Sequence, residues 1–323
     1  MPCIKPLHAV QVQDKILFGM KNQIIYGQNH RTFTIPCSNC IQCRLNQSNE
    51  WAIRCYHESL EHNRNMFITL TYAEDPISLN KIDIKVFIKK LQRAFPKQVR
   101  YFQCGEYGGQ FGRPHHHAII FGINHLNFDD IKRGKSSANG GKTYLSQTLT
   151  DMWGHGQTNI GEVNEKSIRY LTGYVIKKVT GKKQKEHYKG KIPEFITMSR
   201  NKGIGYKYYQ KHKEDMFNHD KTRINGKAHA VPNYYNNHYS IDNPDKMNII
   251  KEERIKKALS KCTFDYKKEI SFSGFHLAKR KLEDKYNLFL DTKRGTLVRE
   301  EKLKRKIELK ERQLNAIRNC ISV

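Results

Sequence analysis

Acidic residues are scarce in this chain. Its 323 residues include 31 Asp and Glu against 58 Lys and Arg, which gives a formal net charge of +27. This excess is far larger than solubility requires. It is not confined to one end, because the residues after 250 contain 21 basic and 11 acidic side chains, a net charge of +10. The charge predicts a polyanionic partner, with nucleic acid favoured over an anionic membrane surface.

Long apolar runs are missing as well. No stretch approaches the roughly 20 apolar residues that a membrane-spanning helix needs, and the first ten residues, MPCIKPLHAV, have the pattern of neither a signal peptide nor a lipidation site. The eight cysteines are few for a chain of this length, and three of them are crowded at one place, which fits reduced thiols or a metal better than a disulfide framework. We therefore expect a protein that stays in the cytosol and does not bind membranes.

A nucleotide-binding P-loop is also absent. The segment KRGKSSANGGKT, residues 132–143, resembles one, but Ser136 stands where the pattern requires glycine and no buried strand precedes it. We interpret residues 132–143 as a solvated basic loop. No motif of a helicase motor is visible elsewhere in the chain.

A histidine-rich stretch, residues 101–122, reads as two strands joined by a glycine-rich turn. Side chains alternate along a strand, so His115 and His117 share one face, whereas His116 lies on the other. The turn glycines let Glu106 stand opposite the two histidines on an antiparallel ladder. This predicts a site with two histidines and one carboxylate that favours Mg²⁺ or Mn²⁺ over a closed structural zinc. The alternative is an exposed basic edge that binds no metal.

A second candidate metal site lies near the N-terminus, where Cys37, Cys40 and Cys43 form a CxxCxxC motif. Short β-like runs at residues 15–35 predict a hairpin that brings Cys3 back as a fourth ligand. Four thiolates can bind a structural Zn²⁺. An iron–sulfur cluster or simple buried thiols remain alternatives.

The order of the other elements predicts an α+β fold. A helix over 43–63 precedes a strand from 65 that ends before Pro76, then a helix over 81–95 and the strands 99–106 and 115–122. This β-α-β-β order predicts an antiparallel sheet covered by helices on one face. Further predicted elements are a helix over 144–153, a strand over 157–163 and a basic linker over 180–191. We expect three regions, 1–62, 63–215 and a basic, largely helical 216–323.

The segment 167–181 predicts a helix that carries two tyrosines. Ile168, Leu171, Val175 and Val179 form the stripe expected to pack on the sheet. Tyr170, Tyr174 and Lys177 cluster on another side, because residues three or four apart are neighbours on a helix. Attack by a phenol on phosphorus needs a metal to polarise the phosphate and a cation to stabilise the developing charge. Ordinary amphipathic packing is the alternative for these tyrosines.

Several motifs together resemble those of a known family. PHHHAIIFG, GEYG, MFITLTY and Y-x-x-x-Y-x-x-K are similar to the motifs of HUH endonucleases. With PCSNCIQCR, WAIRCYHE and PEFITMSRNKGIG, which span about residues 1–240, they resemble the rolling-circle replication initiators of microvirus phages of the gokushovirus-like group. In that family a hydrophobic or aromatic residue usually separates the metal histidines, and here the residue is His116.

The resemblance implies a fold and an activity. It implies a ferredoxin-like or RRM-like core, in which a tyrosine attacks single-stranded origin DNA with the aid of Mg²⁺ or Mn²⁺. The products would be a 5′-phosphotyrosine and a free 3′-OH that a host DNA polymerase extends, and a second tyrosine would later rejoin the displaced strand. Strand separation would come from a host helicase or from supercoiling, in the host bacterial cytoplasm. A non-catalytic, zinc-containing nucleic-acid-binding protein and an HUH transposase or relaxase are the alternatives.

The sequence after residue 192 is less informative. Tyrosines interleaved with Lys and Arg at 193–210 and 231–239 suit stacking on unpaired bases, or cover a small core. After residue 250 the sequence is rich in Lys and Glu, and Leu303, Ile307, Leu314 and Ile317 suggest an amphipathic helix. This tail is a candidate accessory helix, DNA-binding face or partner-binding element.

Overall fold

The computed structural model describes residues 3, 6–13, 15–19, 22, 25, 30–96, 99–108, 111–136, 141–179 and 184–269, without the side chains at 31, 177 and 258–269. The chain divides into two compact units, Met1–Ile241 and Asp242–Val323. In the second unit the described part is mainly helix α9 (Pro244–Glu269), and the predicted amphipathic segment around Leu303 lies outside the described residues. The boundaries at 62/63 and 215/216 stay predictions.

The predicted β-α-β-β order is confirmed. It consists of β4 (Asn65–Thr71), α3 (Lys81–Ala94), β5 (Arg100–Tyr107) and β6 (Pro114–Phe121). These strands belong to a seven-stranded sheet in the order β10-β5-β6-β4-β9-β8-β7, in which every strand pair is antiparallel. The remaining strands of this sheet are β7 (Lys132–Arg133), β8 (Thr143–Leu145), β9 (Thr158–Gly161) and β10 (Phe195–Met198).

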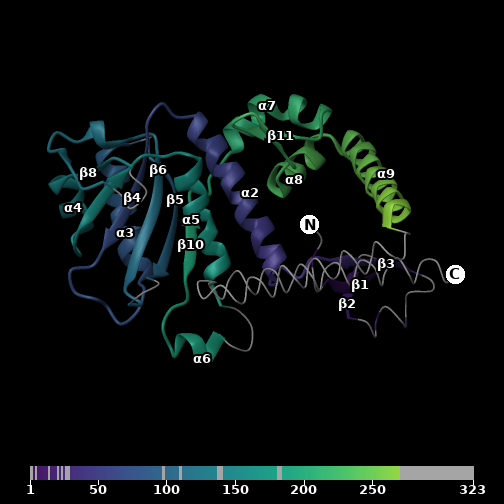
Figure 1. Cartoon of the computed structure of the whole chain (residues 1–323), viewed down its shortest axis with the longest axis horizontal. Coiled ribbons are helices and arrows are strands. Elements are labelled where there is room, and N and C mark those ends of the chain that lie inside the picture. The colour runs from purple at the N-terminus through teal and green to yellow at the C-terminus, as the bar shows by residue number, and fades with distance from the viewer. Residues whose placement is uncertain are drawn as a thin grey trace. The chain divides into compact units, whose positions relative to one another are not determined.

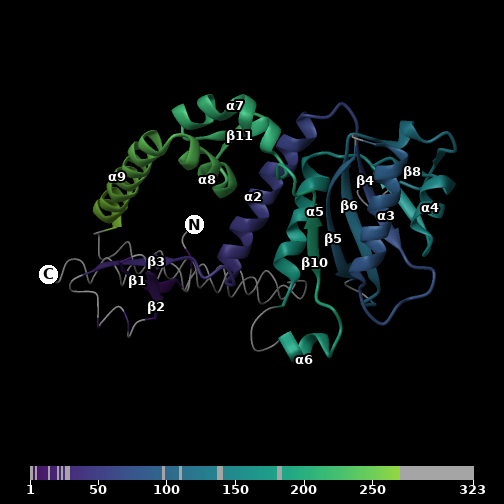
Figure 2. The same ribbon diagram turned by 180° about the vertical axis from the view of Figure 1, so that it is seen from behind.

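Helices cover both faces of the sheet, so the prediction of helices on one face is wrong (Figures 1 and 2). One face packs on α3 and α4 (Gln147–Trp153), through side chains such as Ile84, Leu91 and Trp153. The other face packs on α2 (Ile41–Leu60) and α5 (Glu165–Lys177). The physical reason lies in β6, where all residues from His116 to Phe121 are buried, and a strand that is buried on both sides needs a layer on each.

Local signals account for the helix bounds. The amphipathic helix α3 begins after Asn80, whose side chain accepts a hydrogen bond from the Ile82 N–H, and it ends just before Pro96. The predicted helix over 144–153 is shorter than expected, because residues 143–145 form β8 and Ser146 caps α4. The basic segment 180–191 contains the short helix α6 (Gln184–Tyr188).

The N-terminal residues form a separate three-stranded sheet. Its order is β2-β1-β3, with β1 (Leu7–Val12) between β2 (Lys15–Phe18) and β3 (Arg31–Ile35). The predicted hairpin within residues 15–35 is therefore wrong, because both of its described strands pair with β1. This sheet leads directly into the cysteine motif and α2.

After β10, the described elements up to α9 are small and pack around α2. They are α7 (Tyr206–Asn218), β11 (Thr222–Ile224), β12 (Lys227–His229) and α8 (Asn233–Asp242). A single 3₁₀ turn, η1 (His125–Asn127), follows β6. None of the helices that the structure describes combines the length and the hydropathy needed to cross a bilayer.

Candidate metal centre and its tyrosines

The three predicted metal ligands of the sheet lie together. Glu106 on β5 stands directly opposite His115 on β6, and His117 lies two residues along the same face. The turn that permits this register includes Gly112 with φ +63°, a conformation that favours glycine. One ligand atom of each residue lies within 4.8 Å of the others. The three side chains therefore lie together as the sequence predicts. Their binding of a metal stays a prediction.

The hydrogen bonds of His115 fix the orientation of its ring. The carbonyl oxygen of Arg113 lies 3.0 Å from His115 Nδ1, and a carbonyl only accepts, so Nδ1 carries a proton. The other ring nitrogen, Nε2, points at Glu106 Oε1 at 2.7 Å. An unprotonated nitrogen and a carboxylate oxygen repel each other at this distance unless a proton or a cation lies between them. The pair fits an imidazolium ion pair or a metal ion.

His117 repeats this arrangement with a different outer partner. Its Nδ1 lies 3.0 Å from the Thr69 hydroxyl, and its Nε2 lies 3.2 Å from Glu106 Oε1. Imidazoles that bind metals usually donate their second nitrogen to such an oxygen, which fixes the tautomer. Thr69 was missed by sequence reasoning. The available signal was its position on the same face as the histidines, one strand away in the register Thr69↔His117.

Electrostatics keep the carboxylate of Glu106 charged. Burial by itself would raise the pKa of Glu106. Hydrogen bonds from His115, His117 and Tyr174 lower it by more, so the pKa lies well below its usual range. The side chain is only 3% exposed. A buried carboxylate with a lowered pKa, together with two imidazoles, is a suitable donor set for a divalent cation.

Both predicted tyrosines lie on this face of the sheet. Tyr174 stacks on His117 with ring centroids 5.5 Å apart and planes inclined by 15°, and its hydroxyl donates to Glu106. Tyr170 contacts the same His117 ring edge-on at 5.4 Å and is hydrogen-bonded to Tyr174. Their exposure differs, because Tyr174 is 4% exposed and Tyr170 is 52% exposed. The structure thus brings a phenol directly against the carboxylate of Glu106 and the imidazole of His117.

The phenol of Tyr174 is difficult to ionise in this setting. Burial, the hydrogen bond with Tyr170 and the negative charge of Glu106 together raise the pKa of Tyr174 well above its ordinary value. The predicted cationic partner, Lys177, belongs to the last turn of α5, and its side chain lies outside the described residues. In the predicted packing stripe, Ile168 and Leu171 are buried, Val175 is half-buried and Val179 lies beyond the helix.

The middle histidine faces away from this site, as the alternation of side chains predicts. His116 is fully buried on the opposite face, where its Nε2 lies 3.1 Å from the Tyr72 hydroxyl, which donates to Asp83. Burial, followed by the neighbouring imidazoles, lowers the pKa of His116 to about 3. It is a neutral core residue against Trp153 and Phe195, not a third ligand.

The cysteines also come together. The sulfur atoms of Cys3, Cys37, Cys40 and Cys43 all lie within 4.8 Å of one another, as the predicted zinc site requires. Of the tyrosines expected to stack on bases, Tyr209, Tyr235 and Tyr239 are buried, so for these the core alternative is right. Tyr234 contacts a guanidinium, with Arg54 Cζ 3.8 Å from its ring centroid.

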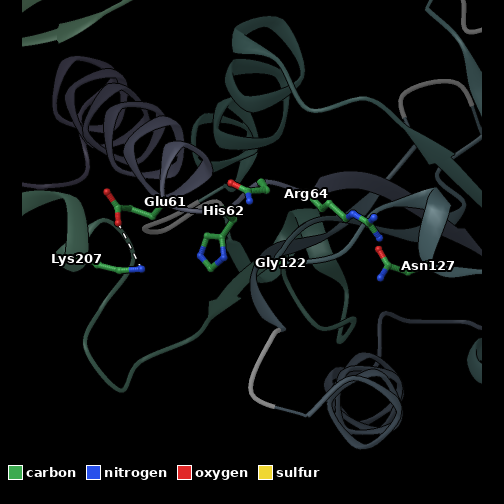
Figure 3. Close-up of a pocket in the computed structure, with 7 residues that line it drawn as sticks. Glu61, His62, Arg64, Gly122, Asn127 and Lys207 are labelled. Carbon is green, nitrogen blue, oxygen red and sulfur yellow. Dashed lines mark ion pairs between the residues drawn. The ribbon is translucent and has the colours of Figure 1, made fainter.

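A basic pocket lies at the other end of β6 from the histidines. It has a volume of about 590 Å³ and is lined by Glu61, His62, Asn63, Arg64, Gly122, Asn127 and Lys207. Figure 3 shows His62 between the Glu61–Lys207 ion pair and Arg64. Lys211 also contacts Glu61, at 2.7 Å. Sequence reasoning missed this pocket, because its residues come from the ends of four segments.

Comparisons with known proteins give a matching family model and two relatives that cover most of the chain. The family model for the replication-associated protein ORF2/G2P matches residues 65–179, from β4 to the helix with the tyrosines. Replication-associated protein VP4 of Bdellovibrio phage phiMH2K is 33% identical over 263 residues, covering 76% of this chain and 79% of that protein. Replication-associated protein ORF2 of Spiroplasma virus 4 is 30% identical over 285 residues, covering 80% and 87%. No solved structure matches the chain. The chain therefore belongs to the family of phage replication-associated proteins.

Proposed function

We propose that this protein initiates rolling-circle replication by nicking single-stranded origin DNA through a tyrosine. The single observation that carries the proposal is the contact of the Tyr174 phenol with both His117 and Glu106 on one face of the sheet. A nucleophile, three metal-ligand side chains and a strongly basic chain are the components of metal-assisted attack on a phosphodiester. The relatives named as replication-associated proteins support the biological setting.

His115, His117 and Glu106 would hold Mg²⁺ or Mn²⁺. When bound, the cation polarises the phosphate and lowers the cost of ionising a nearby phenol. The raised pKa of Tyr174 makes such help necessary, since a neutral phenol is a poor nucleophile near pH 7. We assign Lys177, one turn after Tyr174, to stabilise the developing charge.

The proposed cleavage is a transesterification. The Tyr174 oxygen forms a bond to phosphorus and loses its proton, the bond from phosphorus to the 3′ oxygen breaks, and that oxygen gains a proton. The products are a 5′-phosphotyrosine and a 3′-OH that a host polymerase can extend. Tyr170, whose ring contacts the same imidazole, would make the second cut that lets the displaced strand be rejoined. A host helicase would open the duplex in the bacterial cytoplasm.

The decisive experiment traps the covalent adduct. We expect the purified protein to attach to viral single strands in the presence of Mg²⁺ or Mn²⁺ and to lose this ability when both Tyr170 and Tyr174 become Phe. Sequencing the trapped ends would identify the nick. Tyr206→Phe serves as a matched control, because that phenol lies on α7 outside the site.

Two outcomes would reject the proposal. Adduct formation by the double variant at the wild-type rate would remove the assignment of the nucleophiles. Binding of single strands without cleavage, and unaffected by chelation of divalent metals, would favour the non-catalytic binding protein. An HUH transposase or relaxase would instead cleave sequences unrelated to a phage origin.

A further inference from the structure

The second cluster of metal-ligating side chains, Cys3, Cys37, Cys40 and Cys43, plays no part in the chemistry above. All four cysteines are free of disulfides. Cys3 Sγ and Cys40 Sγ are 3.8 Å apart, far beyond the roughly 2.05 Å of a disulfide bond. Four sulfur atoms at the corners of a tetrahedron with metal–sulfur bonds of about 2.3 Å are separated by about 3.8 Å. The spacing therefore fits a tetrahedral metal site.

The backbone around the sulfurs supports the same conclusion. Backbone N–H groups point at three of them: Cys37 N–H at Cys3 Sγ (3.2 Å), Cys40 N–H at Cys37 Sγ (3.3 Å) and Cys43 N–H at Cys40 Sγ (3.5 Å). These donors stabilise a thiolate more than a neutral thiol, because they favour negative charge on sulfur. Cys40 is also the N-cap of α2, whose N-terminal end favours an anionic group.

A side chain beside the cluster reaches the helix that carries the tyrosines. Arg44, the residue after Cys43, donates from Nη1 to the backbone oxygens of Ile176 (2.8 Å) and Lys178 (2.6 Å). These carbonyls lie at the C-terminal end of α5, where a cation is favourable because the last helical carbonyls lack partners. Ile176 is two residues after Tyr174.

We propose that the four cysteines bind one structural Zn²⁺, and that this site, acting through Arg44, holds the C-terminal end of α5 in place. The zinc fixes the start of α2 and so the direction of Arg44. Arg44 is a positioning residue for the tyrosines. The zinc site stands independently of the proposed nicking activity, whereas the effect on the tyrosines rests on it.

Metal content tests the first part. We expect about one zinc and no iron per purified wild-type chain, by mass spectrometry of the metals, and loss of that zinc in Cys37→Ala and Cys40→Ala. Cys55→Ala is the matched control, because Cys55 is buried in α2 outside the cluster and its removal should leave the zinc in place. Replacement by Co²⁺ should give the absorption of a tetrahedral thiolate site. Wild-type protein without zinc, iron in its place, or full zinc in both cluster variants would overturn the proposal.

Hydrogen exchange tests the second part. Arg44→Gln should retain its zinc but exchange the amides at 174–178 at least 10-fold faster than wild type, while Arg93→Gln, an exposed arginine on α3, should not. The Arg44 variant should also form the DNA adduct more slowly, with Mn²⁺ binding unchanged. Unchanged exchange at α5 would refute the role of Arg44. Because zinc content and exchange are measured without DNA, a protein that fails to nick would reject the proposed function and leave the zinc site and its effect on the end of α5 intact.

Discussion

At the scale of single residues, the candidate metal centre depends on side chains that hydrogen-bond to its ligands without being ligands themselves. The Thr69 hydroxyl, 3.0 Å from His117 Nδ1, is the clearest of these. It holds the imidazole so that Nε2 faces Glu106. Outer partners of this kind commonly change metal affinity or activity by about 10–100-fold when they are removed.

Thr69→Val therefore tests the metal centre without changing a ligand. The substitution keeps the shape of the side chain and removes the hydrogen bond to His117, so we expect Mn²⁺ binding, measured by titration calorimetry, to weaken about 10-fold or more. Thr71→Val is the matched control, since the Thr71 hydroxyl donates to the Gln157 carbonyl and not to a ligand. Equal Mn²⁺ affinity in the two variants would show that Thr69 does not orient a metal ligand.

A glycine in the loop before α7 gives a second prediction at this scale. Gly205 has φ +80°, and a Cβ there would overlap the Tyr235 hydroxyl and lie 3.2 Å from the Arg54 carbonyl. Gly226 has a similar φ of +75° with open space around it. We expect Gly205→Ala to lower the free energy of unfolding by more than about 2 kcal/mol and Gly226→Ala by about 1 kcal/mol, in urea titrations. Similar losses in both would mean that strain alone, not the clash, determines the cost.

At the scale of secondary-structure elements, α2 connects several parts of the first unit. Its N-terminus carries the cysteine cluster, and Ala52 and Cys55 pack against the sheet core. Near its C-terminus, His57 is stacked on Tyr208 with ring centroids 3.9 Å apart and lies 3.0 Å from the Tyr235 hydroxyl. Glu58 accepts a hydrogen bond from the Gly205 N–H and pairs with Arg100. These contacts join α2 to α7 and α8.

The burial of His57 predicts a pH-dependent stability. Burial lowers the pKa of His57 from 6.5 to about 4, so the folded state keeps the ring neutral while the unfolded chain takes up a proton as the pH falls. Stability from this residue is present above about pH 6.5 and is lost as the pH falls towards 4. The stability advantage of wild type over His57→Gln should shrink by about 2 kcal/mol between pH 7.5 and pH 5, in urea titrations. A constant difference would mean that the His57 pKa is not depressed.

At the scale of the whole molecule, the dominant property is charge. A net charge of +27 attracts DNA without distinguishing its sequence, and part of the charge gathers in the pocket around Arg64 and Lys207. This pocket lies about seven residues along β6 from His115, a distance of about 24 Å at 3.4 Å per residue. When single-stranded DNA is bound at the metal centre, the nucleotides that flank the bound phosphate would therefore lie within reach of these cations.

Salt dependence tests this contact. The double variant Arg64→Gln/Lys207→Gln should reduce the slope of log affinity against log salt concentration by about 1.4 for single-stranded DNA, since two phosphate contacts are lost. The double variant Lys85→Gln/Lys89→Gln removes the same charge from the exposed side of α3 and should change the slope by less than half as much. Equal slopes for the two variants, measured by fluorescence anisotropy, would show that the pocket contributes to DNA binding only through the net charge of the protein.

Much of the sheet, the histidine site and the CxxCxxC motif was predictable, because these signals are local. Cys3 lies 34 residues before Cys37, and the predicted hairpin does not bring it back. Alternation along 114–121 separates His116 from His115 and His117, and the glycine turn fixes Glu106 opposite them. The spacing of Ile84, Phe87, Ile88 and Leu91 likewise defines α3. The second layer of helices was not predicted, because an amphipathic pattern shows that a helix has a buried side but not which face of the sheet it covers.

The sequence by itself determined the excess of basic charge, the antiparallel β-α-β-β order and the types of side chain available for metal binding and attack. The tertiary structure alone decided that Tyr174 lies against His117, that Thr69 supports this imidazole and that Arg44 reaches the end of α5. The reason is physical: alternation and helical spacing act over a few residues, whereas these contacts join segments 48 to 132 residues apart in the sequence. The Thr69 contact requires the pairing of β4 with β6, and the Tyr174 and Arg44 contacts require α5 to pack on the sheet beside α2.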